Sequence, residues 1–338
     1  MSKPKTKTRK ASVSADKVAE LAGVSRSAVS RAFTDGASVS PETRAKVLAA
    51  AAQLGYHVNH LARGLLWHRT GIVCLIVAEM QAPFQASMVE VITRRLQAIG
   101  KVVMVLNTSG QADSVESALR QTLNYRADAT VFISGTPPAS LVNTCLENGQ
   151  RVILINRADP IVGPEFISVE NETAALEACL MLKRAGCQRV AVVNSTAGTP
   201  GLASRERTFL EAAAENGLEA CVSRAGPTGY KTGADSARQL LATSRRPEGV
   251  FCVTDLLALG FMDVARLEFR MSIPEDLCVI GFDDIPESNW LGYELTTFRQ
   301  PLQGIADQIA SIVEKEDGEP GAPAVLPTQV VWRKTVRP

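Results

Sequence analysis

The chain has 338 residues, of which 46% are hydrophobic and 21% are charged, and this composition excludes a largely disordered protein. Its length suffices for a small domain followed by one or two larger α/β lobes. The net charge of +1 conceals an uneven distribution, because residues 1–70 carry 12 Lys/Arg against 4 Asp/Glu. A basic first part on a mildly acidic body predicts that the first part contacts a polyanion.

Residues 1–12 contain five Lys/Arg and no acid, and they are expected to form a disordered basic arm. This arm either adds contacts to phosphates or is only a solvated tail. No apolar segment of a secretory signal follows it, and no run approaches the roughly 18 apolar residues of a membrane span. We therefore expect a cytoplasmic protein that does not contact membranes.

Cysteine and histidine usage argues against a disulfide framework or a metal site. The seven cysteines include no C-x-x-C pair, which favours free, buried thiols in a reducing compartment. The spacing of the three histidines fits no zinc pattern. No metal or other cofactor is expected, and no catalytic motif such as a P-loop, a G-x-G-x-x-G turn or a G-x-S-x-G elbow is present.

Residues 13–56 have the pattern of a small helical DNA-binding domain. A first apolar face, a turn at Gly23 and a second apolar face behind a serine N-cap predict a helix-turn-helix. The two faces comprise Val18, Ala19, Leu21 and Ala22, then Ala28, Val29, Ala32 and Phe33. The polar side chains of the second helix would reach bases and phosphates in a major groove. A solvated helical hairpin is the alternative that these residues alone leave open.

A third helix is expected to begin at Ser40-Pro41-Glu42 and to end before Gly55, with Val47, Leu48, Ala51 and Leu54 on one face. Residues 57–70 follow as a segment too short to hold a helix alone in water. They form either a simple linker or a hinge between the head and the rest of the chain.

From residue 71 onward, nearly continuous apolar runs alternate with amphipathic segments, which is typical of parallel, doubly wound α/β sheets. The series is too long for one sheet, and the strand-like run 166–170 lies near its middle, so we expect two lobes with a hinge there. A ligand cleft would lie between them at the carboxyl ends of the strands. The expected strands are 71–80, 101–108, 129–135, 151–157, 166–170, 189–195, 249–255 and 277–284.

Four motifs together make the chain similar to the lactose/galactose repressor family from about Val13 to Val331. They are VAELAGVSRSAVSRAF, VSPETRAKVLAAAAQLGYHVNHLARGL, VTDLLALGF, and VIGFDDI followed by LTTFRQP. The resemblance implies a helix-turn-helix head and a two-lobed domain like that of periplasmic binding proteins. The first lobe would comprise about 71–169 plus 300–328, and the second about 170–299 plus 329–338.

The resemblance also implies a transcriptional regulator, in most relatives a repressor, that binds a pseudo-palindromic operator as a homodimer or homotetramer. The DNA contacts it implies in the head are Ser14, Ser25, Arg26, Ser27, Ser30 and Arg31. Those in the hinge are Asn59, Ala62, Arg63 and Leu65, with Leu65 inserted into the minor groove. Gly64 departs from the usual Ser or Gln, and glycine weakens a helix by roughly 0.5–1 kcal/mol.

For the cleft, the resemblance and the positions at strand ends imply a small polar effector such as a sugar, a sugar acid or a related metabolite. The expected contacts are Phe84, Gln85, Asn107, Arg157, Arg205, Asp255 and Asp283. Gln85 stands where many relatives have a second aromatic residue, which argues against a purine stacked between two rings. The two arginines could pair with an anionic group.

Two other functions remain open at this point. One is a DNA-binding regulator whose cleft no longer binds an effector. The other is a transport-type solute-binding protein, which the basic head argues against. An enzyme is not expected, because no histidine lies in the cleft-forming region and no catalytic motif is present.

Overall fold

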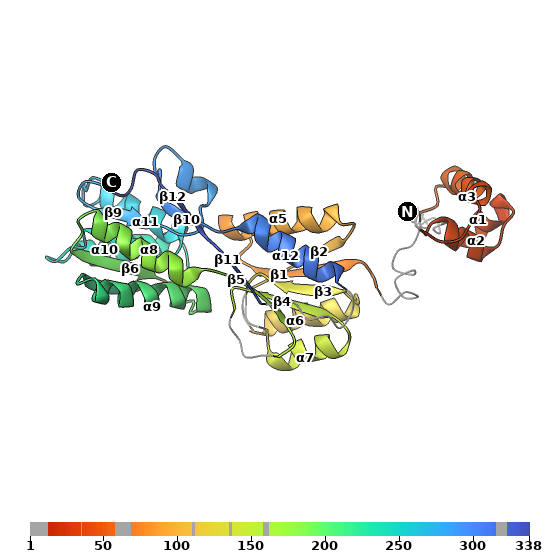
Figure 1. Cartoon of the computed structure of the whole chain (residues 1–338), viewed down its shortest axis with the longest axis horizontal. Coiled ribbons are helices and arrows are strands. Elements are labelled where there is room, and N and C mark those ends of the chain that lie inside the picture. Colours follow the sequence, from red (N-terminus) through yellow and green to blue (C-terminus); the bar gives the residue numbers. More distant parts are fainter. Residues whose placement is uncertain are drawn as a thin grey trace, which may run out of the picture. The chain divides into compact units, whose positions relative to one another are not determined.

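The computed structural model describes residues 13–34, 36–57, 69–109, 112–134, 137–157, 162–315 and 323–338. These residues form two compact units, one within residues 1–70 and one comprising residues 71–338 (Figure 1). Asn59, Ala62, Arg63, Leu65 and the basic arm lie outside the described residues. No helix within the described ranges combines the length and apolar character needed to cross a bilayer.

The first unit is a three-helix domain made of α1 (Ala15–Ala22), α2 (Arg26–Ala32) and α3 (Pro41–Leu54). A serine caps the start of each helix, because Ser14, Ser25 and Ser40 each accept a hydrogen bond from a backbone N–H in the first turn. Gly23 and Gly55 end α1 and α3 in the left-handed conformation that glycine adopts without strain. These caps fix the lengths of the three helices.

The core of this domain is small and comprises Val18, Ala19, Val29, Ala32, Val47, Ala50 and Ala51. The rings of Phe33 and Tyr56 close one side of it, with 5.7 Å between their centroids. Leu21 and Leu48, expected in the core, are both about half exposed. The expectation was wrong for them because each lies at the border of its helix's apolar face.

The first lobe of the larger unit contains a six-stranded parallel sheet in the order β11-β5-β4-β3-β1-β2. Helices α5 (Pro83–Ala98) and α12 (Leu302–Glu314) pack on one face of this sheet, and α6 (Ala112–Asn124) and α7 (Ala139–Glu147) pack on the other. Its strands are β1 (Ile72–Ala78), β2 (Val102–Thr108), β3 (Ala129–Phe132), β4 (Arg151–Ile155), β5 (Glu165–Val169) and β11 (Ala324–Leu326).

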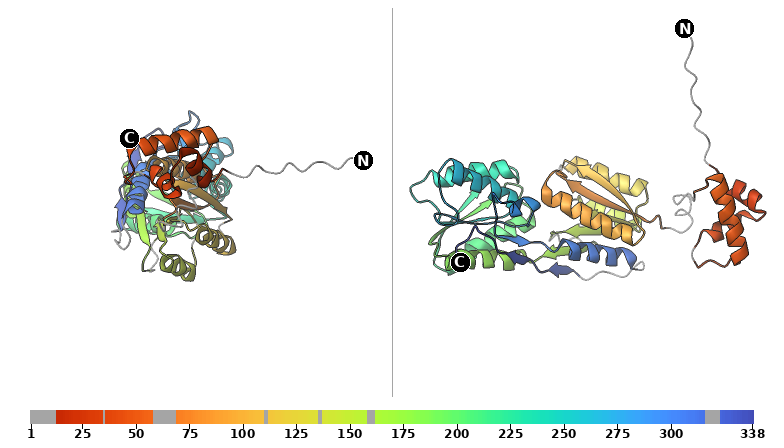
Figure 2. Two further views of the ribbon diagram at one scale, coloured as in Figure 1. Left: turned by 90° about the vertical axis from the view of Figure 1, so that its right-hand side faces the viewer. Right: turned by 90° about the horizontal axis from the view of Figure 1, so that it is seen from above.

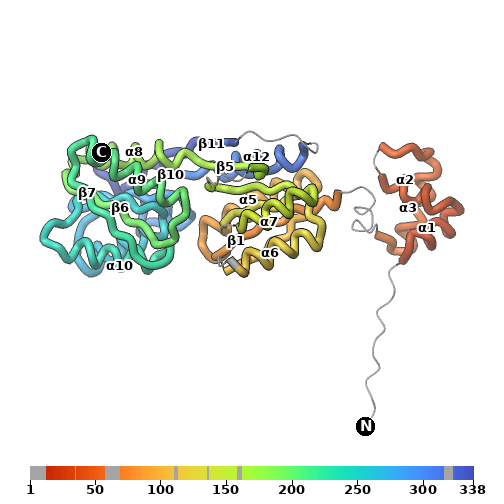
Figure 3. Tube along the Cα trace, turned by 90° about the horizontal axis from the view of Figure 1, so that it is seen from below, coloured from red at the N-terminus to blue at the C-terminus, as the bar shows by residue number. Residues whose placement is uncertain are grey.

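The second lobe has a four-stranded parallel sheet in the order β7-β6-β8-β9. Its strands are β6 (Arg189–Asn194), β7 (Glu219–Arg224), β8 (Gly249–Cys252) and β9 (Cys278–Ile280). Helices α8 (Asn171–Arg184) and α9 (Pro200–Glu215) pack together, as do α10 (Tyr230–Leu241) and α11 (Asp255–Leu267). Figures 2 and 3 show the two lobes of this unit side by side.

The chain passes between the lobes three times: after β5, after β10 (Thr297–Arg299), and between β11 and β12 (Gln329–Val331). Strands β10 and β12 form an antiparallel pair beside these crossings. The first lobe is therefore completed by chain that returns after the second lobe.

All eight expected strands are present in two parallel sheets, which confirms the predicted fold class. The strands that were missed are β7, β10, β11 and β12, and the helix that was missed is α12. Strand β7 lies at a sheet edge and has only three apolar residues in a row between Glu219 and Ser223, so it lacks the longer apolar run of the expected strands. It carries Cys221, which is exposed, whereas the other six cysteines are buried.

Candidate functional site

Helix α2 presents a polar face to solvent. Ser25, Arg26, Ser27, Ser30 and Arg31 are all exposed, and no apolar contact of the head requires them there. The Ser25 hydroxyl caps the helix and also lies 2.9 Å from the Ser27 hydroxyl. An exposed helix face of serines and arginines supplies the donors that reach base edges and phosphates.

A side chain of α3 supports this face from behind, and an exposed ion pair lies at its start. Arg44 of α3 donates hydrogen bonds to the carbonyls of Ala32 and Thr34, and so fixes the end of α2 on the core. Arg26 lies 3.7 Å from Asp16 of α1, but both side chains are largely exposed, so that this pair is weak. Arg26 is therefore available for another partner. The contacts of Arg44 with the end of α2 were not expected from the sequence.

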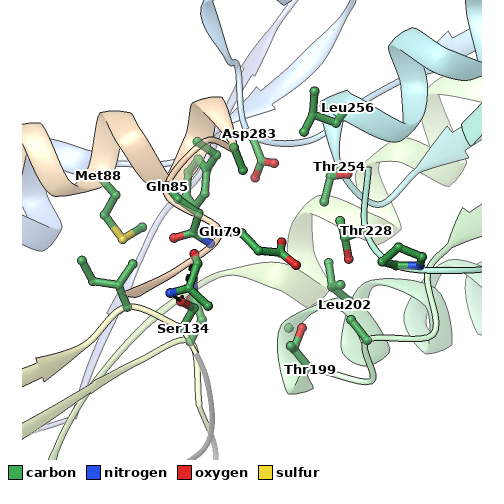
Figure 4. A pocket seen from close by; sticks show the side chains of 18 of the residues that line it. Glu79, Gln85, Met88, Ser134, Thr199, Leu202, Thr228, Thr254, Leu256 and Asp283 are labelled. Carbon is green, nitrogen blue, oxygen red and sulfur yellow. Dashed lines mark hydrogen bonds between the residues drawn. The ribbon is translucent and has the colours of Figure 1, made fainter. Parts of the chain in front are cut away.

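A pocket of about 750 Å³ lies between the two lobes of the larger unit, where strands of both sheets end. In Figure 4, Glu79, Gln85 and Ser134 of the first lobe face Thr228, Thr254 and Leu202 of the second across this space. Of the effector residues expected from the sequence, five line it: Phe84, Gln85, Arg157, Arg205 and Asp283.

Arg205 is held firmly at the pocket wall although it is only 4% exposed. Its Nε donates to Asn171 Oδ1 at 2.8 Å, its Nη1 donates to the Val253 carbonyl at 2.7 Å, and its guanidinium stacks on the Phe282 ring. Burial lowers the pKa of Arg205 to about 10, and the nearby carboxylates of Asp283 and Asp255 act in the opposite direction. These contacts use Nε and Nη1, so the Nη2 group of Arg205 can donate to a ligand.

Asp283 and Asp284 lie in the loop after β9, both with a positive φ, of 130° and 56°. Such conformations cost energy in non-glycine residues and persist where neighbours enforce them. Arg299 and Arg333 each donate to Asp284 at 2.6 Å, and Gln300 Nε2 donates to Asp283 Oδ1 at 2.7 Å. Burial raises the pKa of Asp283 to about 8, with Arg205 acting against that rise.

Two expected effector residues do not line the pocket. Asn107 is exposed on β2, the outermost strand of its sheet, whereas the pocket lies at the ends of the inner strands β1, β3 and β4. Asp255 is fully buried, and its carboxylate accepts hydrogen bonds from Thr297 Oγ1, Ser288 Oγ and the Ile285 N–H. These contacts make Asp255 an internal brace of the loop that carries Asp283, and burial raises its pKa to about 6.

Several polar lining residues were missed, although most of them lie at the carboxyl ends of expected strands or directly after them. They are Glu79, Ser134, Asn156, Thr196, Thr199, Thr228, Thr254 and Gln300. Thr254 and Gln300 are 8% and 3% exposed, yet Thr254 Oγ1, Gln300 Oε1 and the buried Gln85 Oε1 have no hydrogen-bond partner in the protein. Buried polar atoms without partners are costly, and a bound molecule would satisfy them.

Comparison with known proteins identifies the family. Residues 16–59 match the bacterial regulatory proteins of the lacI family, and residues 180–336 match a periplasmic binding protein-like domain. The chain is 30% identical over 291 residues to the HTH-type transcriptional regulator GalS of Salmonella typhimurium, covering 86% of this chain and 85% of that protein. The chain belongs to the lacI family of bacterial regulatory proteins. Catabolite control protein A of Priestia megaterium is 29% identical over 292 residues, covering 85% of this chain and 87% of that protein.

Solved structures show the lacI fold over nearly the whole chain. The lac repressor dimer bound to operator and an anti-inducer matches with a TM-score of 0.82 at 22% identity, covering 97% of this chain and all of that one. The CelR–cellobiose complex matches with a TM-score of 0.71 at 25% identity, covering 96% of this chain and 99% of that one. As a lacI-family member, the chain is a DNA-binding transcriptional regulator and not an enzyme.

Proposed function

We propose that this regulator binds a pseudo-palindromic operator as a homodimer and that a small, hydroxyl-rich effector in the inter-lobe pocket controls this binding. The pocket carries the proposal: three buried polar atoms without partners, two carboxyl groups and two guanidinium groups border a space of ligand size. These unpaired atoms also argue against the alternative of a regulator whose cleft binds no effector. Without an effector, the three buried atoms would never have a hydrogen-bond partner.

The DNA contacts follow from the exposed face of α2. Arg26 and Arg31 would read base edges, Ser27 would tolerate several bases, and Ser14, Ser25 and Ser30 would bind phosphates. In the segment outside the described residues, we propose that Asn59, Ala62, Arg63 and Leu65 reach the minor groove. Two half-sites then follow from two copies of the chain.

The homodimer would use an exposed apolar surface around α11. Leu291, Trp290 and Leu267 are 92%, 57% and 68% exposed, and this surface also includes Tyr230. The segments that carry these side chains lie next to one another, because Tyr230 and Tyr293 both donate to Asp263 and Arg266 donates to the Gly292 carbonyl. An apolar surface of this kind marks an interaction site. A second copy is the natural occupant, since a matching lac repressor structure is a dimer on its operator.

The effector proposal is tested by a thermal-shift screen of the full chain against neutral sugars, sugar acids and nucleosides. A binder at one hundred times its Kd adds about 2.7 kcal/mol to the free energy of unfolding. The same panel is run on Gln300→Leu, which removes one unpartnered acceptor from the pocket wall. A hit that shifts the parent and not the variant supports the site. A panel without any hit favours the regulator with an inert cleft.

A further inference from the structure

Two buried thiols of the second lobe share one arginine. Arg337 Nη2 donates to Cys187 Sγ at 3.3 Å, and the backbone N–H of Arg337 donates to Cys278 Sγ at 3.5 Å. Cys187 lies between α8 and β6, and Cys278 is the first residue of β9, so these cysteines are 91 positions apart in sequence. Both are fully buried, and neither takes part in the proposed DNA or effector sites.

Gly249 explains why the two thiols meet. Cys278 is the register partner of Gly249 on the adjoining parallel strand, where side chains of paired residues point to the same face. A Cβ at position 249 would lie only 2.9 Å from Cys187 Sγ, so the Cys187 thiol occupies the space above the glycine. The two sulfurs consequently lie on one face of the sheet, where Arg337 contacts both of them and the Cys187 thiol donates to the Glu248 carbonyl at 3.3 Å.

We propose that Cys187 and Cys278 are a modification site at which a peroxide forms a reversible intramolecular disulfide. The Cys278 thiolate attacks one peroxide oxygen, the O–O bond breaks, and a sulfenic acid and water result. Cys187 then attacks the sulfenic sulfur, the S–S bond forms, and the hydroxyl leaves as a second water. Two thiols and one hydrogen peroxide thus give one disulfide and two waters. A dithiol reductant reverses the change.

The surroundings suit this chemistry. The neighbouring Cys187 thiol lowers the pKa of the Cys278 thiol, the N–H and the charge of Arg337 act in the same direction, and burial opposes them. The Arg337 side chain covers the pair and is held by the carbonyls of Ala185, Pro274 and Glu275. Displacement of this one half-buried side chain would give the peroxide access to the two thiols. The pair lies at the amino ends of the strands, opposite the pocket, so that oxidation leaves the pocket residues in place.

The test uses the reduced full chain treated with a tenfold molar excess of hydrogen peroxide. Remaining thiols are alkylated, and the protein is digested with trypsin without reductant. We expect peptide 185–189 joined to peptide 271–299, with a mass two hydrogens below their sum, and expect dithiothreitol to release both. Cys221→Ser, which removes the exposed thiol, should leave the yield unchanged. Cys187→Ser should abolish the linkage.

A mixture of ¹⁵N-labelled and unlabelled protein separates the intramolecular bond from a link between molecules. The proposal requires cross-linked pairs of one isotope only. It is overturned if mixed pairs dominate, or if both peptides are recovered alkylated while Cys221 oxidises. Gly249→Ala keeps both thiols and adds a Cβ only 2.9 Å from Cys187 Sγ, which displaces this sulfur, so its linkage should form at least fivefold more slowly. An equal rate would contradict the role of Gly249 in leaving space for the Cys187 thiol beside Cys278.

Discussion

The guanidinium carbon of Arg205 lies 3.3 Å from the centre of the Phe282 ring, close enough for a cation–π contact in a buried setting. Phe282 in turn stacks on Phe298 of β10, with 5.9 Å between ring centroids. The pocket arginine is thus joined through two aromatic rings to a strand beside the lobe crossings. We therefore expect that a ligand that moves Arg205 would also shift β10, beside the segments that join the two lobes.

Replacing Arg205 by Ala should abolish the effector-induced thermal shift and also destabilise the second lobe. The change leaves Asn171 Oδ1 and the Val253 carbonyl without their donor, which costs about 1–3 kcal/mol for each buried group. Urea denaturation measures the loss. Arg207→Ala is the matched control, because Arg207 is exposed and pairs with Glu172 on the surface, where about 0.5 kcal/mol or less is expected. Equal losses in the two variants would contradict the assigned role.

Stability should depend on pH through Asp283. Folding raises the pKa of this carboxyl from 3.8 to about 8, so between these values the folded chain binds the proton more tightly than the unfolded chain. The free energy of unfolding contributed by this group therefore falls as the pH rises through that window. Asp283→Asn removes the effect and can still accept from Gln300. Its stability relative to the parent should increase from pH 5 to pH 8 in chemical denaturation. A difference that stays constant or decreases would show that the Arg205 charge dominates instead.

Arg26→Ala should relax base preference at one position of each operator half-site. Loss of a bidentate contact to guanine costs about 1–3 kcal/mol of discrimination. Selection from random DNA, followed by sequencing, compares the preferences of parent and variant. Lys46→Ala, on the exposed side of α3 beside Glu42, should leave the preference unchanged. An unaltered preference in Arg26→Ala would place the recognition surface elsewhere.

Leu65→Ala should lower operator affinity and reduce DNA bending without changing the fold of the larger unit. Inserting an apolar side chain opens a base step at a cost of a few kcal/mol, offset by the contacts that the bend permits. Pyrimidine–purine steps open most readily, so one is expected at the operator centre. Gel shifts with circularly permuted operator fragments measure the bend angle. Equal angles and equal affinities would mean that residues 57–70 are only a linker.

Leu291→Asp should convert the homodimer into monomers, because it places a charge at the most exposed apolar residue of the surface around α11. Sedimentation velocity at micromolar concentration measures the change in mass. Val222→Asp, a charge on the exposed edge strand β7, is the control and should remain dimeric. If both variants keep the dimer mass, the interface lies on another face.

The sequence predicted the head and the two parallel sheets because serine caps, glycine stops and continuous apolar runs are local signals. It also predicted that residues at strand ends would line a cleft between the lobes, and Arg157 and Asp283 do line the pocket. The same rule failed for Asn107, because the order of strands in a sheet is set by packing between distant segments. It failed for Asp255 because the direction of a side chain at a helix start depends on the loop packed against it. Gln300 was missed for a related reason, since β10 carries only three residues and no apolar run.

The interleaving of the two lobes along the chain has a consequence for biosynthesis. Strand β11 completes the first sheet beside β5, and residues 333–337 bind the second lobe through Arg333, Thr335 and Arg337. Neither lobe can therefore finish folding until the ribosome has made the segment from β11 onward. A nascent or prematurely terminated chain presents an open sheet edge at β5, where chaperones, proteases and aggregation partners compete.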